Sequence, residues 1–175
     1  MPDGVTPLRI LLSIGANLGN RQRTVTAAMD MIEEHGLLYE CLRSPLYETE
    51  PVGFTEQPPF VNCCMSGITT IDIHDVRSEL SQIETTLGRT PRAKWHEREI
   101  DIDIILAGNH IVNSDALTIP HPRMAERRFV LQPAADIEPA MFHPLFSIDV
   151  QTLLERCTDT AAVTLYHHER ANTGT

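Results

Sequence analysis

A chain of 175 residues, 42% of them hydrophobic and 22% charged, is long enough to bury the core of one compact domain. Its net charge of −10 argues against a general nucleic-acid or membrane-binding surface, because such surfaces are basic. The four cysteines include no CxxC pair, which argues against a disulfide scaffold and favours a reducing compartment. No apolar run approaches the ~20 residues of a membrane span. Residues 1–7 lack the features of a signal peptide, so we expect a cytoplasmic protein.

The first half of the chain predicts strands and one helix. An apolar run at residues 8–14 predicts a buried strand. Apolar residues then recur at helical spacing between Asn20, a suitable N-cap, and Gly36, which ends the helix. Two strand-like stretches follow at residues 37–48, interrupted by Ser44-Pro45, and at residues 60–71. A loop rich in proline and glycine separates them.

The second half predicts a helix, a basic segment and another strand. Apolar residues at positions 76, 80, 83 and 87 form a helical stripe, with Asp72 or Asp75 as cap and Gly88 as stop. Residues 89–98 are polar and basic, and residues 99–106 alternate as a strand. A turn at Gly108-Asn109 predicts a short return strand at residues 111–112. Residues 120–144 combine prolines with short helical pieces, and we expect the last dozen residues to be weakly ordered.

The order of these elements predicts the fold class. Strand, helix, strand, strand, helix, strand is the split βαβ pattern of ferredoxin-like α+β domains. We therefore predict a mostly antiparallel sheet with helices packed on it. No repeat or interdomain linker divides the chain, so we expect one domain over residues 1–175, with its motifs in about residues 8–144.

The strand EIDIDIIL at residues 99–106 has an unusual polar face. Its isoleucines at positions 100, 102 and 104 fall on one face, whereas Glu99, Asp101 and Asp103 fall on the other. A wet strand surface is one interpretation. The other is a cation site, because Asp101 and Asp103 point the same way and Mg²⁺ accepts one or two carboxylates together with phosphate oxygens. Arg98, only three residues before Asp101, favours the cation site, since metal carboxylates beside guanidinium groups suit phosphoryl transfer.

The basic segment GRTPRAKWHER contains the only tryptophan of the chain, Trp95. A solvated surface loop is the simpler interpretation, yet an aromatic ring among charges is unusual there. Bounded by Gly88 and Pro91, the segment could close as a lid that brings Arg89 and Arg98 onto an anionic ligand. Trp95 could then stack on a planar heterocycle.

Two further stretches hold candidate binding residues. In TEPVGFTEQPPFVN, Phe60 suits either a core or a ligand contact, and Asn62 needs partners for both ends of its amide. In IPHPRMAERRFVLQP, a basic group includes His121 and Arg127, which could donate hydrogen bonds to phosphate oxygens. Local positive charge on an acidic chain favours a small anionic ligand over a polyanion.

Together with the opening SIGANLGN, the segments ETEPVGFTEQPPFVN, GRTPRAKWHEREIDIDIIL and IPHPRMAERRFVL resemble the 6-hydroxymethyl-7,8-dihydropterin pyrophosphokinase family of folate biosynthesis. The resemblance covers about residues 8–144 with the motifs in the family's order. It implies transfer of the β,γ-pyrophosphoryl group of ATP to the pterin hydroxymethyl oxygen, with release of AMP. It also implies small-molecule substrates, two Mg²⁺ ions and no nucleic-acid or membrane partner, and we expect a monomer.

The resemblance also implies roles for individual residues. Asp101 and Asp103 would bind the two Mg²⁺ ions, and the lid arginines Arg89 and Arg98 would engage the triphosphate. The pterin would lie against Thr49, Pro51, Val52, Gly53, Phe60, Asn62, Trp95 and Phe129. ATP would contact Glu84, Ile104 through its backbone, Thr118, His121 and Arg127, in addition to the two lid arginines.

This chain departs from the family pattern in the lid and at one stacking residue. The family usually has Trp-Gly-Pro-Arg where this chain has Trp95, His96, Glu97 and Arg98, which should change lid folding and adds a carboxylate. Phe60 replaces a frequent tyrosine and keeps the ring. No residue stands out as general base. The alternatives are a metal-dependent phosphohydrolase, which would cleave ATP without a pterin, and a non-catalytic binding module, which would release no AMP.

Overall fold

The computed structural model describes residues 6–53, 55–91 and 96–167. Its principal sheet has the strand order β10-β3-β4-β1-β5, and β2 also pairs with β4. These strands are β1 (Leu8–Ala16), β2 (Tyr39–Arg43), β3 (Tyr47–Thr49), β4 (Phe60–Thr69), β5 (Asp101–Ala107) and β10 (Val163–Leu165). The helices are α1 (Arg21–Glu34), α2 (Ile73–Thr86), the 3-10 turn η1 (Met124–Glu126), α3 (Arg128–Ile137) and α4 (Val150–Arg156).

The sheet has the predicted split βαβ topology. Strand β4 pairs with β1 and also with both β2 and β3, and β1 lies between β4 and β5. Every pairing in this sheet is antiparallel. The α+β prediction with a mostly antiparallel sheet is therefore confirmed, and β1 joins the edge strand β5 to the rest of the sheet.

Local sequence explains where the two long helices begin. The side chain of Asn20 accepts a hydrogen bond from the N–H of Arg23 and caps α1, as predicted. Asp72, rather than Asp75, caps α2 by accepting from the N–H of His74. The predicted apolar stripes face the core, since Val25, Ala28, Met29 and Ile32 in α1 and Val76, Leu80 and Ile83 in α2 are all buried.

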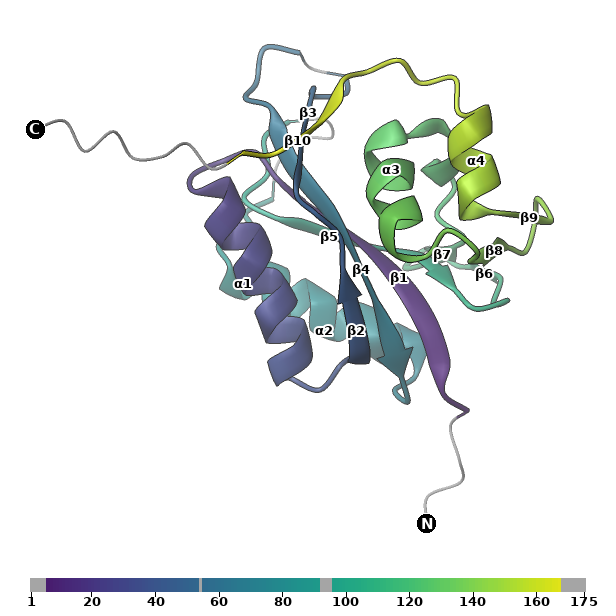
Figure 1. The fold of residues 1–175 in the computed structure, drawn as a ribbon. Coiled ribbons are helices and arrows are strands. Elements are labelled where there is room, and N and C mark those ends of the chain that lie inside the picture. Colours follow the sequence, from purple (N-terminus) through teal and green to yellow (C-terminus); the bar gives the residue numbers. More distant parts are fainter. Residues whose placement is uncertain (1–5, 54, 92–95, 168–175) are drawn as a thin grey trace, which may run out of the picture.

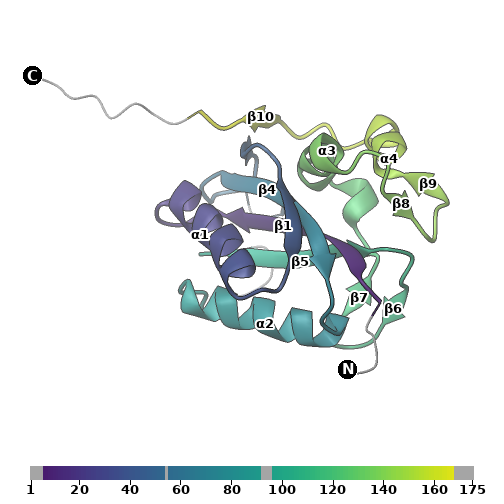
Figure 2. The ribbon, with the colours of Figure 1, turned by 60° about the horizontal axis from the view of Figure 1, so that its bottom comes forward.

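Two apolar clusters lie on opposite faces of the sheet. Helices α1 and α2 cover one face, and α3 and α4 cover the other (Figure 1, Figure 2). Strand β1 serves both clusters by alternation: Ile10, Leu12 and Ile14 belong to the first and Leu11 to the second. Because Ser13 and Gly15 share the orientation of Leu11, they face the α3 side, where the site described below lies.

The structure differs from the sequence-based expectations in three details. The return strand, β6 (Val112–Asn113), pairs with β7 (Thr118–Ile119) in a separate ribbon and not with β5. Helix α4 and strand β10 were not predicted, and β10 lies where the expected weakly ordered tail begins. Strand β5 begins at Asp101, so Glu99 precedes it. A further ribbon joins β8 (Phe142–His143) and β9 (Ile148–Asp149).

Two other properties concern the chain as a whole. All four cysteines are free, and Cys63 and Cys64 are fully buried in the core, as the sequence indicates. Within the described ranges, no helix combines the length and the apolar composition that crossing a membrane requires.

Candidate active site

A cavity of about 390 Å³ opens on the α3 side of the sheet, within the usual size range of small-molecule sites. It gathers residues from β1, β3, β4, β5, α3 and the loops beside them. The lining residues are Ser13, Gly15, Thr49, Glu50, Val52, Gln57, Phe60, Asn62, His96, Arg98, Asp101, Asp103, His121, Pro122, Arg123, Arg127, Phe129 and Val130. Segments that are far apart in the sequence thus line the same cavity.

The register of β1 brings the candidate pterin and metal residues together. Gly15 pairs with Asn62 of β4 on one side and with Asp101 of β5 on the other. Directly opposed residues in neighbouring strands point to the same face of a sheet, and the strands lie about 4.8 Å apart. Asn62 and Asp101 therefore lie about 10 Å apart, on either side of Gly15. At this separation, one could contact a heterocycle while the other contacts a neighbouring phosphate-bearing ligand.

One end of the cavity combines aromatic rings with a buried amide. Phe60 and Phe129 both line it, and the buried Asn62 donates a hydrogen bond through Nδ2 to the hydroxyl of Thr49 at 2.6 Å. An ideal Cβ on Gly15 would lie 2.2 Å from Oδ1 of Asn62. Glycine at this position leaves the space that the amide occupies. This end can hold a flat, polar-edged heterocycle.

Asp101 and Asp103 form the acidic end of the cavity. Burial, reinforced by the charge of Asp103, raises the pKa of Asp101 to about 6, although 39% of its side chain is exposed. Burial also raises the pKa of Asp103, although Arg77 opposes this shift. The two ionised carboxylates are thus costly side by side, and a cation would relieve that cost.

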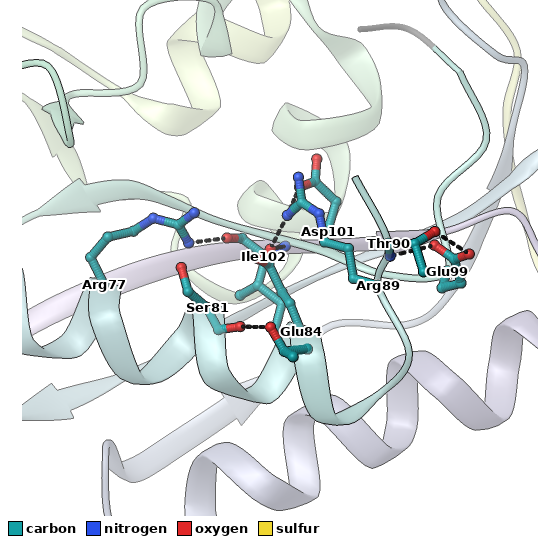
Figure 3. A network of polar contacts seen from close by, with 9 residues as sticks. Arg77, Ser81, Glu84, Arg89, Thr90, Glu99, Asp101 and Ile102 are labelled. Carbon is teal, nitrogen blue, oxygen red and sulfur yellow. Dashed lines mark hydrogen bonds and ion pairs between the residues drawn. The ribbon is translucent and has the colours of Figure 1, made fainter. Parts of the chain in front are cut away.

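A partly buried ion-pair network, built on the buried Glu84, supports this acidic end (Figure 3). Nη1 of Arg89 lies 2.7 Å from Oε1 of Glu84 and 3.0 Å from Oδ1 of Asp101. The same Glu84 oxygen accepts a hydrogen bond from the N–H of Ile102 at 2.7 Å. Burial raises the pKa of Glu84, although that N–H and Arg89 favour its ionised form. Glu84 therefore positions both the strand between the two aspartates and the arginine beside them.

Glu99, to which the sequence assigned no role, lies next to the start of the basic segment. The backbone N–H and the hydroxyl of Thr90 lie 3.4 and 3.3 Å from its two carboxylate oxygens (Figure 3). These contacts join the two ends of the segment that spans residues 90–99. Glu99 thus fixes the segment's base instead of extending the carboxylate face of β5.

A positive edge faces the carboxylates across the cavity. Burial, followed by the charge of Arg127, lowers the pKa of His121 to about 4. Nδ1 of His121 accepts a hydrogen bond from the N–H of Arg123 at 3.1 Å, so its proton is assigned to Nε2. The guanidinium of Arg127 lies 5.6 Å from the ring centre of Phe129. This edge offers hydrogen-bond donors to an anionic ligand.

Not every predicted site residue lines this cavity. Those that do are Thr49, Val52, Phe60, Asn62, Arg98, Asp101, Asp103, His121, Arg127 and Phe129. Glu84 and Arg89 line a neighbouring recess, to which Arg98 also contributes. Pro51, Gly53, Ile104 and Thr118 line neither, and Trp95 lies outside the described residues.

Sequence reasoning missed several cavity residues. Ser13 and Gly15 belong to an apolar strand whose alternation gives no sign of function, and their pairing with Asp103 and Asp101 brings them to the site. Gln57 and Glu50 lie in a loop whose path no periodicity predicts. The SIGANLGN motif was the available signal, because it includes Ser13 and Gly15.

The chemistry of the donor set fits magnesium. Two carboxylates on one strand face, beside a region of donors suited to phosphates, match the preference of Mg²⁺ for few protein ligands. Among the described residues, no cluster of three or more histidine, cysteine or acidic side chains could hold a metal without other ligands. The residues present thus fit a metal that phosphate oxygens would help to bind.

Comparison with known proteins agrees with this geometry. Residues 11–139 match the family described as 7,8-dihydro-6-hydroxymethylpterin-pyrophosphokinase, HPPK. This chain belongs to the HPPK family. The 2-amino-4-hydroxy-6-hydroxymethyldihydropteridine pyrophosphokinase of Bacillus subtilis is 35% identical over 126 residues, which cover 72% of this chain and 75% of the relative. The enzyme of the same name from Aquifex aeolicus is 33% identical over 137 residues, covering 78% and 84%. The family predicted from the sequence is confirmed.

Other HPPK relatives are longer proteins. A folic acid synthesis protein of Pneumocystis carinii is 36% identical over 151 residues, covering 86% of this chain and 20% of that protein. The crystal structure of a doubly substituted variant of HPPK-DHPS from Plasmodium falciparum with pterin and p-hydroxybenzoate has a TM-score of 0.68 at 14% identity, covering 86% of this chain and 43% of that one. This chain thus spans a fifth to less than half of these relatives, and the structural likeness shows the fold.

The segment predicted to close as a lid is where this HPPK chain departs from the family pattern given above. His96, in the place of the family's glycine, lines the cavity, and its Nδ1 lies 3.8 Å from a carboxylate oxygen of Glu97. The side chains of His96 and Glu97 are 43% and 30% exposed. The substitution therefore places an imidazole and a carboxylate at the mouth of the site.

Proposed function

We propose that this chain is a 6-hydroxymethyl-7,8-dihydropterin pyrophosphokinase that uses ATP as co-substrate. The hydroxymethyl oxygen forms a bond to the β-phosphorus of ATP, the bond between that phosphorus and the α,β-bridging oxygen breaks, and AMP leaves. One observation carries the proposal: Gly15 pairs with Asn62 and Asp101, which joins an aromatic, amide-bearing pocket to a pair of carboxylates in one cavity.

The pterin ring is proposed to bind between Phe60 and Phe129. Asn62, oriented by Thr49, would read the polar edge of the ring, because a buried amide without its ligand partner is costly and an analogue lacking the matching groups is rejected. Val52 supports this assignment, since it also lines the cavity. Pro51, Gly53 and Trp95 remain predictions of the family resemblance.

Asp101 and Asp103 are proposed to hold two Mg²⁺ ions. Bound there, the ions would neutralise phosphate charge and help to align the triphosphate with the pterin hydroxymethyl group. Burial raises the pKa of both carboxyl groups, and the charge of Asp103 adds to the shift of Asp101, so a bound cation would stabilise their ionised forms.

The triphosphate is proposed to lie against Arg98, His121 and Arg127, all of which line the cavity. Neutral His121 would donate from Nε2, and the guanidinium groups would stabilise charge that develops during transfer. Arg89, Glu84, Ile104 and Thr118 are the remaining proposed ATP contacts. Catalysis then rests on alignment and charge stabilisation, with Asp101 or Asp103 as our hypothesis for the proton acceptor.

One assay tests the proposal. The chain is incubated with ATP, MgCl₂ and 6-hydroxymethyl-7,8-dihydropterin, and the nucleotides are separated by ion-exchange chromatography. We expect AMP in amounts equal to the pyrophosphorylated pterin. ADP that depends on the pterin would instead indicate a simple phosphotransferase, ATP loss without pterin a phosphohydrolase, and binding without turnover a sensor module.

Two variants refine the assay. Asp103→Ala should lower turnover by at least about 10²-fold at saturating Mg²⁺, because a carboxylate that orients charged phosphates is lost. Asp115→Ala, at an exposed carboxylate outside the cavity lining, is the matched control and should keep wild-type turnover. Sedimentation analysis tests the further proposal that the chain is a monomer.

A further inference from the structure

Asn17, just after β1, contacts two loops that are about 40 residues apart in the sequence, one at Gln57 and Pro58 and one at Arg98. It is 2% exposed. Its Nδ2 group donates to Oε1 of Gln57 at 2.9 Å and to the carbonyl of Pro58 at 3.0 Å. Its Oδ1 accepts from the backbone N–H of Arg98 at 2.7 Å, and its own N–H donates to the carbonyl of Arg98 at 3.0 Å. Both ends of the amide are thus used.

These bonds reach both substrate regions of the cavity. Gln57 and Arg98 line the cavity, whereas Asn17 does not. Gln57 belongs to the loop between Thr49 and Phe60, which bounds the aromatic end. Arg98 ends the basic segment and precedes Asp101 by three residues. Asn17 therefore touches the backbone or side chain of a residue at each end of the site, although it contacts neither proposed substrate position itself.

The geometry leaves little freedom between the two loops. The two backbone bonds of Arg98 fix its peptide groups against the end of β1, and the side-chain amide of Asn17 fixes the loop on the other side. A small rotation of the Asn17 side chain would break either the bond to Arg98 or those to Gln57 and Pro58. Burial makes such a break costly, because water cannot replace the lost partner.

We propose that Asn17 is a positioning residue that sets the distance between Arg98 and the loop between Thr49 and Phe60, called the pterin loop below. This inference rests on the proposed pyrophosphokinase function. Because misplacing reacting groups by about 1 Å can cost 10²-fold in rate, a residue that fixes both loops governs turnover without touching substrate. Asparagine suits this position because its amide combines two donors and one strong acceptor in a short side chain.

Two substitutions separate the two contacts. Asn17→Asp keeps an acceptor for the N–H of Arg98 but removes both donors to the pterin loop. Asn17→Ala removes all three side-chain bonds. We expect Asn17→Asp to raise the KM for the pterin about tenfold with kcat within about threefold of wild type, and Asn17→Ala to lower kcat about 30-fold as well.

Hydrogen exchange by mass spectrometry gives a readout that needs no turnover. In Asn17→Ala, peptides that contain residues 55–57 and Arg98 should both exchange faster than in the wild type. In Asn17→Asp, only the peptide with residues 55–57 should do so. If the alanine variant does not fold, the split between KM and kcat in Asn17→Asp and its exchange pattern decide the question.

Asn20→Ala is the matched control. Asn20 lies three residues further along and caps α1 through the N–H of Arg23, with no hydrogen bond to Gln57 or Arg98. Its loss removes a helix cap and should lower stability, yet leave kcat and KM at wild-type values. Wild-type kcat in folded Asn17→Ala, or unchanged exchange at Arg98, overturns the proposal. A wild-type chain that makes no AMP defeats the proposed function instead, and the exchange data still decide the role of Asn17.

Discussion

Replacing Gly15 by alanine tests how closely the sheet and the proposed pterin pocket are fitted. Gly15 is a strand residue without a positive φ, so its backbone accepts alanine and only contacts exclude it. The new Cβ would lie 2.2 Å from Oδ1 and 3.3 Å from Cγ of Asn62. Ordinary contact begins at 3.4 Å, so the amide must move by about 1 Å. The 2.6 Å bond from Asn62 to Thr49 cannot survive that movement intact.

The expected cost combines two effects. Overpacking a well-packed site costs ~1–3 kcal/mol. A buried pair that loses its hydrogen bond costs ~1–3 kcal/mol more. We therefore expect Gly15→Ala to lower the free energy of unfolding in urea by about 3 kcal/mol. Calorimetric affinity for the oxidised substrate analogue 6-hydroxymethylpterin should fall about 30-fold, since the displaced amide no longer faces the ring edge.

Asn62→Ala supplies the control background. With Asn62 truncated, the nearest remaining side-chain atom to the new Cβ is Cδ1 of Phe60 at 3.8 Å, an ordinary contact. The stability cost of Gly15→Ala should then fall below about 1 kcal/mol, so the double-mutant cycle is strongly non-additive. Equal costs in both backgrounds, or wild-type pterin affinity in the single variant, would refute the argument that Gly15 is present to admit Asn62.

Three further predictions concern titratable groups. Because the pKa of Asp101 is raised to about 6, its contribution to stability is present below pH 4 and is lost as the pH rises through about 6. A cation that binds the ionised carboxylate should restore stability, so MgCl₂ should raise the Tm at pH 7.5 but not at pH 4.5. MgCl₂ should not raise the Tm of Asp101→Asn. The lowered pKa of His121 has the opposite sign: stability present above pH 6.5 falls as the pH falls through about 4, and His121→Gln should reduce that loss in urea titrations. Burial raises the pKa of Cys63 to about 12, so an aromatic disulfide reagent at pH 8 should modify Cys63 only after unfolding, as mass mapping of the labelled peptides would show.

The alternation of residues along the chain predicts most of the sheet. The isoleucines at positions 100, 102 and 104 are 0–3% exposed, as the pattern of EIDIDIIL predicts. The apolar stripes of α1 and α2 likewise face the core. Such patterns succeed because one buried face imposes a strict period on each element.

Strand partners over long distances are harder to predict. β10 pairs with β3 through residues more than 110 positions apart, and only three residues form each strand. β6 is two residues long and pairs with β7, although a turn at Gly108 suggested β5. In such short segments side-chain alternation carries little information, and tertiary contacts decide the pairing.

The sequence predicts the residues that would contact the ligands, but not the residues that position them. Asp101, Asp103 and Asn62 stand out because their side chains are unfavourable inside strands unless they serve a ligand. Gly15 and Asn17 belong to an apolar strand and a turn, where glycine and asparagine are common. Only the register of β1 with β4 and β5 shows that Gly15 separates the two ends of the site.

Strand β5 explains how the fold tolerates such a site. Its carboxylate face costs free energy, because burial raises the pKa of both aspartates and the nearby arginines Arg77 and Arg89 offset only part of that shift. With Asp101 39% exposed, solvent screening limits that cost to about 1–2 kcal/mol. The isoleucine at each of positions 100, 102 and 104 gains ~1.5–3 kcal/mol by burial on the opposite face. The free energy gained by burying the isoleucines is therefore several times the cost of the carboxylates. The strand stays stable, although the two aspartates that the proposed chemistry needs destabilise it.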